Sequence, residues 1–219
     1  MIVDLAFSPL SILFFLGSCL SVFAGFAVLI FAKVTKREKL GRVVRMAMLA
    51  GAGVYVALLL GVSLFSKEYV LGRGAEKHYC EVDCHIAYSV TDVRQVKTMA
   101  EGGAKTAQGM FYVVTVRTRF DETTINPNRG NGVLHPNPRD VYALDEQGHH
   151  YAPLTAGAAA LLEKPLRPGE WYDTQILFDL PVGAREPRLF IENASWENHL
   201  LIGHENSPLH KKAYFSLRG

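Results

Sequence analysis

Two cysteines and a histidine, Cys80, Cys84 and His85, are the residues of this chain whose types and spacing could carry chemistry. One interpretation is a disulfide, because two cysteines in an oxidising extracytoplasmic compartment usually pair. On an extended strand, residues four apart lie about 13 Å from each other, whereas the Cα atoms of a disulfide lie within about 7 Å. A bond between Cys80 and Cys84 therefore requires a turn at residues 81–83, and we expect it to fix a local shape.

Copper binding is a second interpretation, because thiolate and imidazole ligands suit copper. Two apolar helices followed by a β-domain with a Cys-x-x-x-Cys pair resemble the layout of subunit II of cytochrome c oxidase, which holds a dinuclear copper site. In that family the pair lies near the end of the domain, and a histidine follows four residues after the second cysteine. Here the pair opens the domain and His85 follows Cys84 directly, so the resemblance concerns the layout.

Covalent haem attachment and a redox-active dithiol are two further interpretations of the same three residues. The haem signature C-x-x-C-H is one residue shorter than the C-x-x-x-C-H run found here. A thioredoxin-like dithiol belongs to a βαβ pattern that this sequence lacks. The sequence also contains no G-x-S-x-G, no H-E-x-x-H and no phosphate-binding glycine loop. We therefore expect a non-catalytic protein without a cofactor or metal, with copper or haem at Cys80, Cys84 and His85 as the alternative.

Two long apolar runs precede this motif and must position it relative to a membrane. Residues 5–32 and 46–66 contain no Asp, Glu, Lys, Arg or His. About 20 apolar residues, each rising 1.5 Å, cross a bilayer, so both runs predict transmembrane helices. The absence of charged side chains within them argues against a proton path, a channel or a transporter.

The loop between these runs, residues 33–45, predicts the orientation of the hairpin. It contains six Lys and Arg residues and one acid, and short loops of this composition stay in the cytoplasm. We therefore expect both termini and everything after residue 66 on the periplasmic side of a bacterial plasma membrane. From residue 67 onward, 17 Lys and Arg face 19 Asp and Glu. The basic balance of the chain thus belongs to the loop, and we expect no nucleic-acid partner.

Small residues recur on both predicted helices: Gly17, Ser21 and Gly25 on the first, and Gly51, Gly53 and Gly61 on the second. Helices in lipid pair where small residues let their backbones approach closely. The two helices of the hairpin can pack on each other over these residues, or the residues can seat a helix of another subunit. Both interpretations make them helix-packing residues.

The remainder of the chain predicts short strands separated by turns. Apolar side chains alternate with polar ones in the stretches 86–90, 110–120 and 171–180, in which Ile176 and Phe178 are expected to point inward. We predict three parts: a transmembrane hairpin at 1–66, a linker at 67–79 and an extracytoplasmic β-domain at 80–219. Within that domain we expect a hairpin at 140–153 and a helical turn at 156–162. We also expect short strands at 188–192 and 213–217, and loops at 98–109 and 121–137. These elements favour an all-β antiparallel sandwich.

Four stretches of this domain resemble a known family: GMFYVVTV at 109–116, the hairpin at 145–151, LRPG at 166–169 and LFDLP at 177–181. They are similar to the immunoglobulin-like sandwiches of unknown function found on bacterial lipoproteins and membrane-anchored proteins. That resemblance implies an extracytoplasmic module for binding or scaffolding. We therefore expect an accessory subunit that contacts lipid, and that contacts other membrane subunits through its helix faces and its sandwich. The layout directs the search first to respiratory or photosynthetic electron-transfer complexes.

Overall fold

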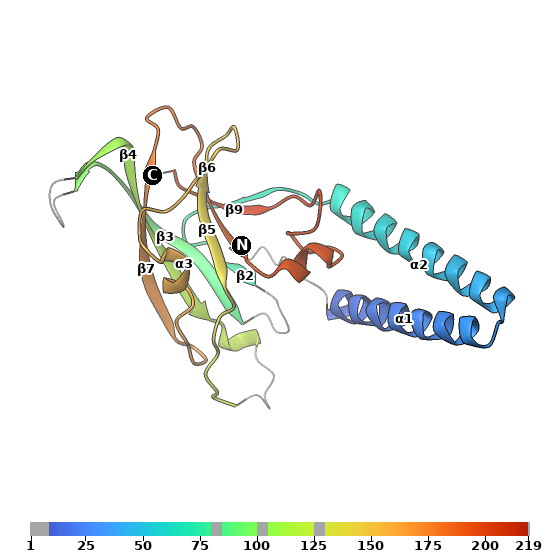
Figure 1. The fold of residues 1–219 in the computed structure, drawn as a ribbon. Helices are drawn as coiled ribbons and strands as arrows, with labels where there is room; N and C mark the ends of the chain where they lie inside the picture. The colour runs from blue at the N-terminus through green and yellow to red at the C-terminus, as the bar shows by residue number, and fades with distance from the viewer. Residues whose placement is uncertain (1–8, 80–84, 100–104, 125–129, 219) are drawn as a thin grey trace. The chain divides into compact units, whose positions relative to one another are not determined.

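The chain folds as two compact units, one helical and one built of strands (Figure 1). The structure is a computed structural model and describes residues 9–79, 85–99, 105–124 and 130–218. The helical unit comprises Phe7–Lys67 together with Trp196–Lys211, and the β unit comprises Glu68–Ser195 together with Lys212–Gly219.

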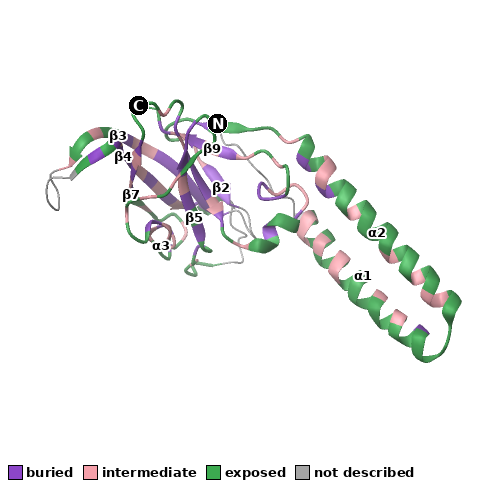
Figure 2. Cartoon of the chain, turned by 45° about the horizontal axis from the view of Figure 1, so that its top comes forward, coloured by how far each residue is buried: buried purple, intermediate pink, exposed green. Residues whose placement is uncertain are grey.

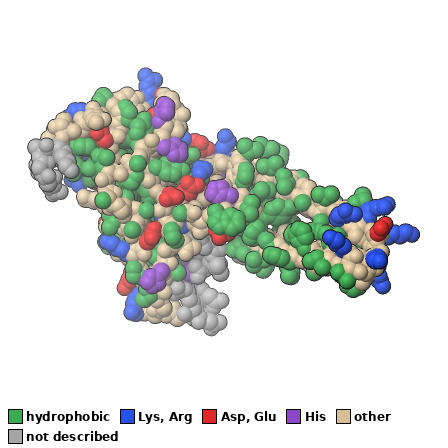
Figure 3. Space-filling view, viewed as in Figure 1, with side chains coloured by type: hydrophobic (Ala, Val, Ile, Leu, Met, Phe, Trp, Pro, Cys, Tyr) green, Lys and Arg blue, Asp and Glu red, His purple; other side chains and the backbone are tan. Residues whose placement is uncertain are grey.

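Two antiparallel helices, α1 (Pro9–Val34) and α2 (Glu38–Leu64), make up most of the helical unit. Both are long and apolar enough to cross a membrane, as their sequences predict. Their surfaces are largely exposed in Figure 2, and Lys and Arg side chains gather at the turn between them in Figure 3. The two helices approach each other closely at Gly25, where an added Cβ would lie 2.6 Å from Met48 Sδ.

Two sheets face each other in the β unit, with strand orders β1-β9-β8-β5-β6 and β2-β3-β4-β7. The strands are β1 (Tyr69–Leu71), β2 (Lys77–Tyr79), β3 (Ile86–Met99), β4 (Lys105–Phe120), β5 (Arg139–Leu144), β6 (His150–Tyr151), β7 (Trp171–Leu180), β8 (Arg188–Asn193) and β9 (Ala213–Ser216). The described residues also form three short helices: η1 (Glu122–Thr124), α3 (Ala158–Leu161) and η2 (Trp196–Leu200). The predicted hairpin at 140–153 and the helical turn at 156–162 are present as β5–β6 and α3.

The core lies between the two sheets and follows the alternation of their strands. In β7, Thr174, Ile176, Phe178 and Leu180 are buried, and the residues between them are less buried or exposed. Ile176 and Phe178 are fully buried, as predicted. Because alternate side chains of a strand point to opposite faces, each sheet contributes one apolar face to the sandwich. The predicted β-sandwich is therefore confirmed.

One strand pair departs from the predicted antiparallel arrangement, since β1 and β9 are parallel. The chain passes from the helical unit into the β unit twice, at Glu68 after α2 and again at Lys212. The two strands that follow these crossings therefore run in the same direction, and the Tyr69 N–H donates to the Lys212 carbonyl over 3.2 Å. Every other named strand pair is antiparallel.

Residues 67–79, expected as a linker, contain β1 and β2 instead. The KHY run of β2 looks solvated in the sequence, but all three of its residues are buried. Lys77 Nζ lies 4.7 Å from the ring centres of both Tyr79 and Phe190, and it donates to the Ala213 carbonyl over 3.1 Å. Aromatic faces and a carbonyl oxygen thus replace water around this ammonium group, which allows a charged residue to lie in a buried strand.

The loop expected at 98–109 is shorter, because β3 extends to Met99 and β4 starts at Lys105. The Lys97 side chain bridges the two strands by donating to the carbonyls of Ala107 and Gly109, over 2.9 and 2.7 Å. The register of the pair shifts between Val96 and Thr98. Glycines and small residues in the sequence made this part of the hairpin resemble a loop.

Candidate functional site

Of the three residues with predicted chemistry, His85 lies within the described part of the chain, whereas Cys80 and Cys84 lie outside it. The neighbours of this motif, Tyr79 and Ile86, are cross-strand partners of β2 and β3. The His85 ring is buried and stacks on Phe120, with 5.2 Å between ring centres. The disulfide, copper, haem and dithiol interpretations of the motif stay predictions.

Four polar side chains lie together beside these neighbours, and we call them the Asp121 cluster: Glu76, His78, Arg119 and Asp121. His78 belongs to β2 and Arg119 to β4, while Glu76 and Asp121 lie just outside those strands. The backbone connects the cluster to the motif, because the Asp121 N–H donates to the His85 carbonyl over 2.7 Å.

Short ion pairs and hydrogen bonds connect all four members of the Asp121 cluster. The Arg119 guanidinium donates twice to the Glu76 carboxylate, over 2.7 Å each. It also lies 3.2 Å from Asp121 Oδ2, which is 3.0 Å from His78 Nε2. The other oxygen, Asp121 Oδ1, accepts hydrogen bonds from the Thr123 N–H at 2.9 Å and from its hydroxyl at 2.7 Å.

This environment keeps both carboxylates ionised. Burial by itself raises the pKa of Asp121, but hydrogen bonds from Thr123, His78 and Arg119 outweigh it and hold the pKa well below its usual range. Hydrogen bonding from Arg119 likewise lowers the pKa of Glu76, and hydrogen bonding to Glu76 raises the pKa of Arg119. The cluster is therefore a charged network at neutral pH that fastens β2 to the end of β4.

Three members of the cluster could in principle hold a metal ion, since donor atoms of Glu76, His78 and Asp121 lie within 4.8 Å of one another. Carboxylate and imidazole groups are ordinary metal ligands. However, the Arg119 guanidinium already occupies the Glu76 carboxylate and contacts Asp121. Because arginine stays protonated, a metal ion would have to displace this fixed charge. As it stands, the cluster favours an ion-pair network over a metal site.

The Asp121 cluster was not predicted from the sequence, although the sequence contains one indication of it. The pattern of 110–120 placed Arg119 on the outer face of the strand, directly before the acidic start of the loop at Asp121. The other two members lie in the segment that was expected to be a linker. Glu76 is 43 residues from Arg119, and His78 is 43 residues from Asp121. These two residues can be assigned to the cluster only once β2 is known to be a strand.

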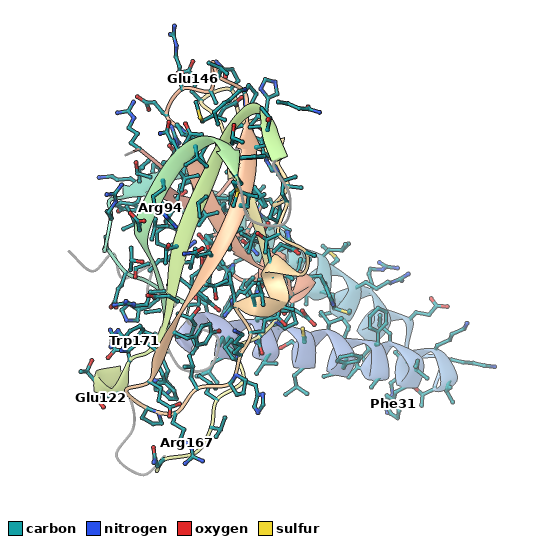
Figure 4. All side chains as sticks on the ribbon, turned by 90° about the vertical axis from the view of Figure 1, so that its left-hand side faces the viewer. Phe31, Arg94, Glu122, Glu146, Arg167 and Trp171 are labelled. Atoms are coloured by element: carbon teal, nitrogen blue, oxygen red, sulfur yellow. The ribbon has the colours of Figure 1, made fainter. Side chains whose placement is uncertain are left out.

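A second candidate surface lies at the opposite end of β4 and β7. Figure 4 shows Glu122 and Trp171 at one end of the unit and Glu146 at the other. A groove of about 1070 Å³ opens at the Met110–Leu180 end of the strand pair, where its apolar walls include Met99, Phe111, Tyr151, Leu154, Leu177 and Val182. Its carboxylate, Asp179, accepts hydrogen bonds from the Gln108 and Gly109 N–H groups, over 2.8 and 2.9 Å. Asp179 thus has a structural role in joining the two strands.

Of the six predicted helix-packing residues, Gly25 lies at the described contact between α1 and α2. The other four glycines are Gly17, Gly51, Gly53 and Gly61. A Cβ on any of them would meet no atom of the described residues within 4 Å. The Ser21 hydroxyl donates to the Gly17 carbonyl of its own helix over 2.8 Å. The helix hairpin therefore closes over Gly25 and leaves small-residue surface uncovered elsewhere.

Comparison with known proteins identifies no family for this chain. No family model and no curated protein matches it. A secreted protein of Mycobacterium tuberculosis, MPT63, is similar over 70% of this chain and 99% of its own length, with 14% identity and a TM-score of 0.41. An uncharacterized β-sandwich protein of Clostridium difficile 630 is similar over 70% of this chain and 95% of its own, with 10% identity and a TM-score of 0.37. At this distance, neither neighbour assigns a family or an activity to the chain.

Replacing Asp121 by Asn should remove a pH-dependent part of the stability. The folded pKa of Asp121 is depressed, so its contribution is complete above the unfolded pKa near 4 and is lost as the pH falls through the folded value. At neutral pH we expect Asp121→Asn to lower the free energy of unfolding by roughly 2–3 kcal/mol. Denaturant unfolding of the full chain in detergent, repeated between pH 7 and pH 3, measures the difference, which should shrink toward the acid end.

The matched control is Asp173→Asn, which breaks the Arg117–Asp173 pair on the outer face of β4 and β7. Those two side chains are 34% and 36% exposed, and exposed ion pairs contribute less than about 1 kcal/mol. Equal losses for the two variants, or a loss for Asp121→Asn that does not change with pH, would refute the structural role of the cluster.

Proposed function

We propose that this protein is a non-catalytic accessory subunit, anchored in a membrane by α1 and α2, whose β-sandwich docks onto and stabilises a larger membrane complex. The observation that carries the proposal is the uncovered small-residue surface at Gly17, Gly51, Gly53 and Gly61. Helices in lipid gain no hydrophobic free energy by pairing, so close packing over small residues is a main source of their association. A helix of another subunit would supply the contacts that the hairpin lacks at these positions.

The apolar groove of the β unit supports the same function from outside the membrane. Leu154 and Val182 on its rim are 55% and 76% exposed. Large exposed apolar side chains gathered at one groove are typical of protein-binding surfaces. A respiratory or photosynthetic electron-transfer complex is the assembly to search first, because the layout resembles that of an oxidase subunit.

We further propose that the β unit lies on the periplasmic side of a bacterial plasma membrane. Lys36 and Arg37 lie in the turn between α1 and α2. Lys33 lies in the last turn of α1, and Lys39, Arg42 and Arg45 lie in the first turns of α2. Positive charges next to membrane spans resist translocation, which keeps this turn in the cytoplasm. Both described ends of the hairpin then lie on the other side.

Electron transfer or metal delivery is the second candidate function, with copper or haem bound at Cys80, Cys84 and His85. The observation that favours it is that two further side chains of types that can bind metals, His78 and Asp121, lie together in the part of the fold to which His85 belongs. His78 and Asp121 are both buried and lie 3.0 Å apart at the closest, and the Asp121 backbone bonds to that of His85. Displacement of Arg119 would free the carboxylates for a metal ion.

Purification of the tagged chain from its native membrane in mild detergent should bring down stoichiometric partner subunits. Gly51→Leu and Gly53→Leu add bulk where the chain itself has open space, so they should remove these partners and leave the hairpin folded. Leucine also has a higher helix propensity than glycine, so α2 itself is not weakened. Val54→Leu, at a position already 58% exposed, is the control and should retain the partners. A clean monomer at native expression would refute the accessory role.

The orientation can be tested with single reporter cysteines after Cys19, Cys80 and Cys84 are replaced by Ser. Asn131→Cys lies in an exposed part of the β unit, and Thr35→Cys lies in the exposed turn between the helices without changing its charge. In intact cells, a membrane-impermeant thiol reagent should label the cysteine at 131. The cysteine at 35 should react only after permeabilisation. The opposite labelling pattern would mean that the hairpin is inverted.

The second candidate function predicts bound metal or colour in the purified full chain. If copper is bound, metal analysis should find about one copper per chain; if haem is bound, an optical spectrum should show a Soret band. Whichever signal is present should disappear in Cys80→Ser. The accessory proposal predicts neither signal. Cys19→Ser is the control, because Cys19 is a free cysteine of α1 and its loss should change nothing.

A further inference from the structure

Most of the connection between β8 and β9, residues 196–211, belongs to the helical unit and lies beside the C-terminal part of α2. Three contacts attach it: Leu200 with Tyr55, Gly203 with Val62, and Lys211 with Ser66. Their order along the segment is the same as their order along α2. The segment therefore runs beside α2 from the level of Tyr55 to the end of the helix, and we call it the α2-flanking segment.

Hydrogen bonds and close packing define these contacts. The Tyr55 hydroxyl donates to the Leu200 carbonyl over 2.6 Å, and the Lys211 N–H donates to Ser66 Oγ over 2.7 Å. A Cβ on Gly203 would lie 3.7 Å from Val62 Cγ1, and Gly203 has a φ of +83° that favours glycine. The Tyr55 ring also stacks on Phe14 of α1, with 5.7 Å between ring centres. A residue of α1 thus packs against the tyrosine that binds the segment.

The contact with Tyr55 lies within the apolar length of the helices. Arg45 is the last charged residue of α2, and Tyr55 precedes its end at Leu64 by nine residues, or about 13 Å at 1.5 Å per residue. On α1, Phe14 lies only four residues, or about 6 Å, from Leu10. Since a bilayer core is about 30 Å thick, both estimates place the Leu200 carbonyl at the depth of the leaflet opposite the basic turn.

Hydrogen bonds within the α2-flanking segment pair part of its own backbone. After η2, successive turns pair the N–H of one residue with the carbonyl three positions earlier: Leu201 with Asn198, His204 with Leu201, Ser207 with His204, and His210 with Ser207. The Ser207 hydroxyl donates to the Leu201 carbonyl as well. Hydrocarbon offers no hydrogen bonds, so non-helical backbone near it must be paired within the protein.

Large apolar side chains of this segment are nevertheless exposed on the protein. Trp196 is 66%, Leu200 is 39% and Leu209 is 63% exposed. Leu209 also has a φ of +65°, in the left-handed region that bulky residues rarely adopt. An exposed leucine in this conformation gains nothing in water, whereas burial of the same side chain in lipid is favourable.

We infer that the α2-flanking segment is a third membrane contact of this chain, and that Trp196 and Leu209 bind the lipid surface of the leaflet opposite the basic turn. The inference rests on the proposed membrane anchoring by α1 and α2. Lipid is the occupant that fits, because the segment continues the surface of two candidate membrane spans. Tryptophan prefers the boundary between headgroups and hydrocarbon, where its ring is in an apolar layer and its N–H can reach polar groups.

The two tryptophans of the chain allow a direct test. In Trp171→Phe, all tryptophan fluorescence comes from Trp196, and the substitution keeps an aromatic ring under Arg117, whose Cζ lies 3.9 Å from the Trp171 ring centre. In phosphatidylcholine nanodiscs, lipids brominated near the headgroup end of the acyl chain should quench most of this emission, and iodide in the water should quench little. The wild-type chain gives a second measurement. Brominated lipid should quench only the part of its fluorescence that comes from Trp196.

The matched control is Trp196→Phe, which leaves Trp171, a 54% exposed residue of β7, as the source of emission. Iodide should quench it and brominated lipid should not. Retention of the full chain in membranes washed with alkaline carbonate tests the anchoring separately. A chain that is washed out would overturn the anchoring and this inference together. A retained chain in which Trp196 responds to iodide as Trp171 does would overturn this inference alone.

Discussion

The parallel pairing of β1 and β9 is the constraint on which the arrangement of the β unit depends. Two parallel neighbouring strands need a long connection in the sequence. Here strands β2 to β8 and the α2-flanking segment come between β1 and β9 along the chain. The register pairs Tyr69 with Ala213 and Leu71 with Phe215, and the last three of these side chains are buried. Leu71 and Phe215 belong to the core of the sandwich, so both strands that follow the helical unit contribute to it.

Buried charges give the sandwich its specific pairing. Inside it, Lys77 and Arg139 lie against aromatic rings, and the Arg139 guanidinium is 4.7 Å from the Tyr79 ring centre and donates to the Tyr88 hydroxyl over 3.3 Å. At its edge, Arg119 joins Glu76 and Asp121. Removal of water from a charge is costly unless partners replace it, so a shifted register of β2 would leave these groups poorly compensated. The charged residues that made the β2 segment resemble a solvated linker in the sequence thus fix the position of β2 in the fold.

The exposed surfaces of the two units support the proposed accessory role. In the helical unit, four glycines lie in open space and the α2-flanking segment exposes a tryptophan and two leucines. In the β unit, the carboxylates that face polar neighbours are already engaged: Asp121 by three side chains, Asp179 by two backbone N–H groups, and Asp145 by His149 and Tyr151. Those hydrogen bonds outweigh the burial of Asp145 and lower its pKa to about 2.

Features that depend on local patterns could be predicted from the amino-acid sequence. Uninterrupted apolar runs predicted α1 and α2, and alternation predicted the inward side chains of β4 and β7, because helix and strand periodicity needs no distant partner. Contacts between residues far apart in the sequence became known from the folded structure. Lys77 reads as solvated until Tyr79, Phe190 and the Ala213 carbonyl surround it. The α2-flanking segment joins the helices through Tyr55 and Leu200, which are 145 residues apart. Such contacts depend on strand pairing and on the route of the chain between its units, and no local pattern encodes either of these.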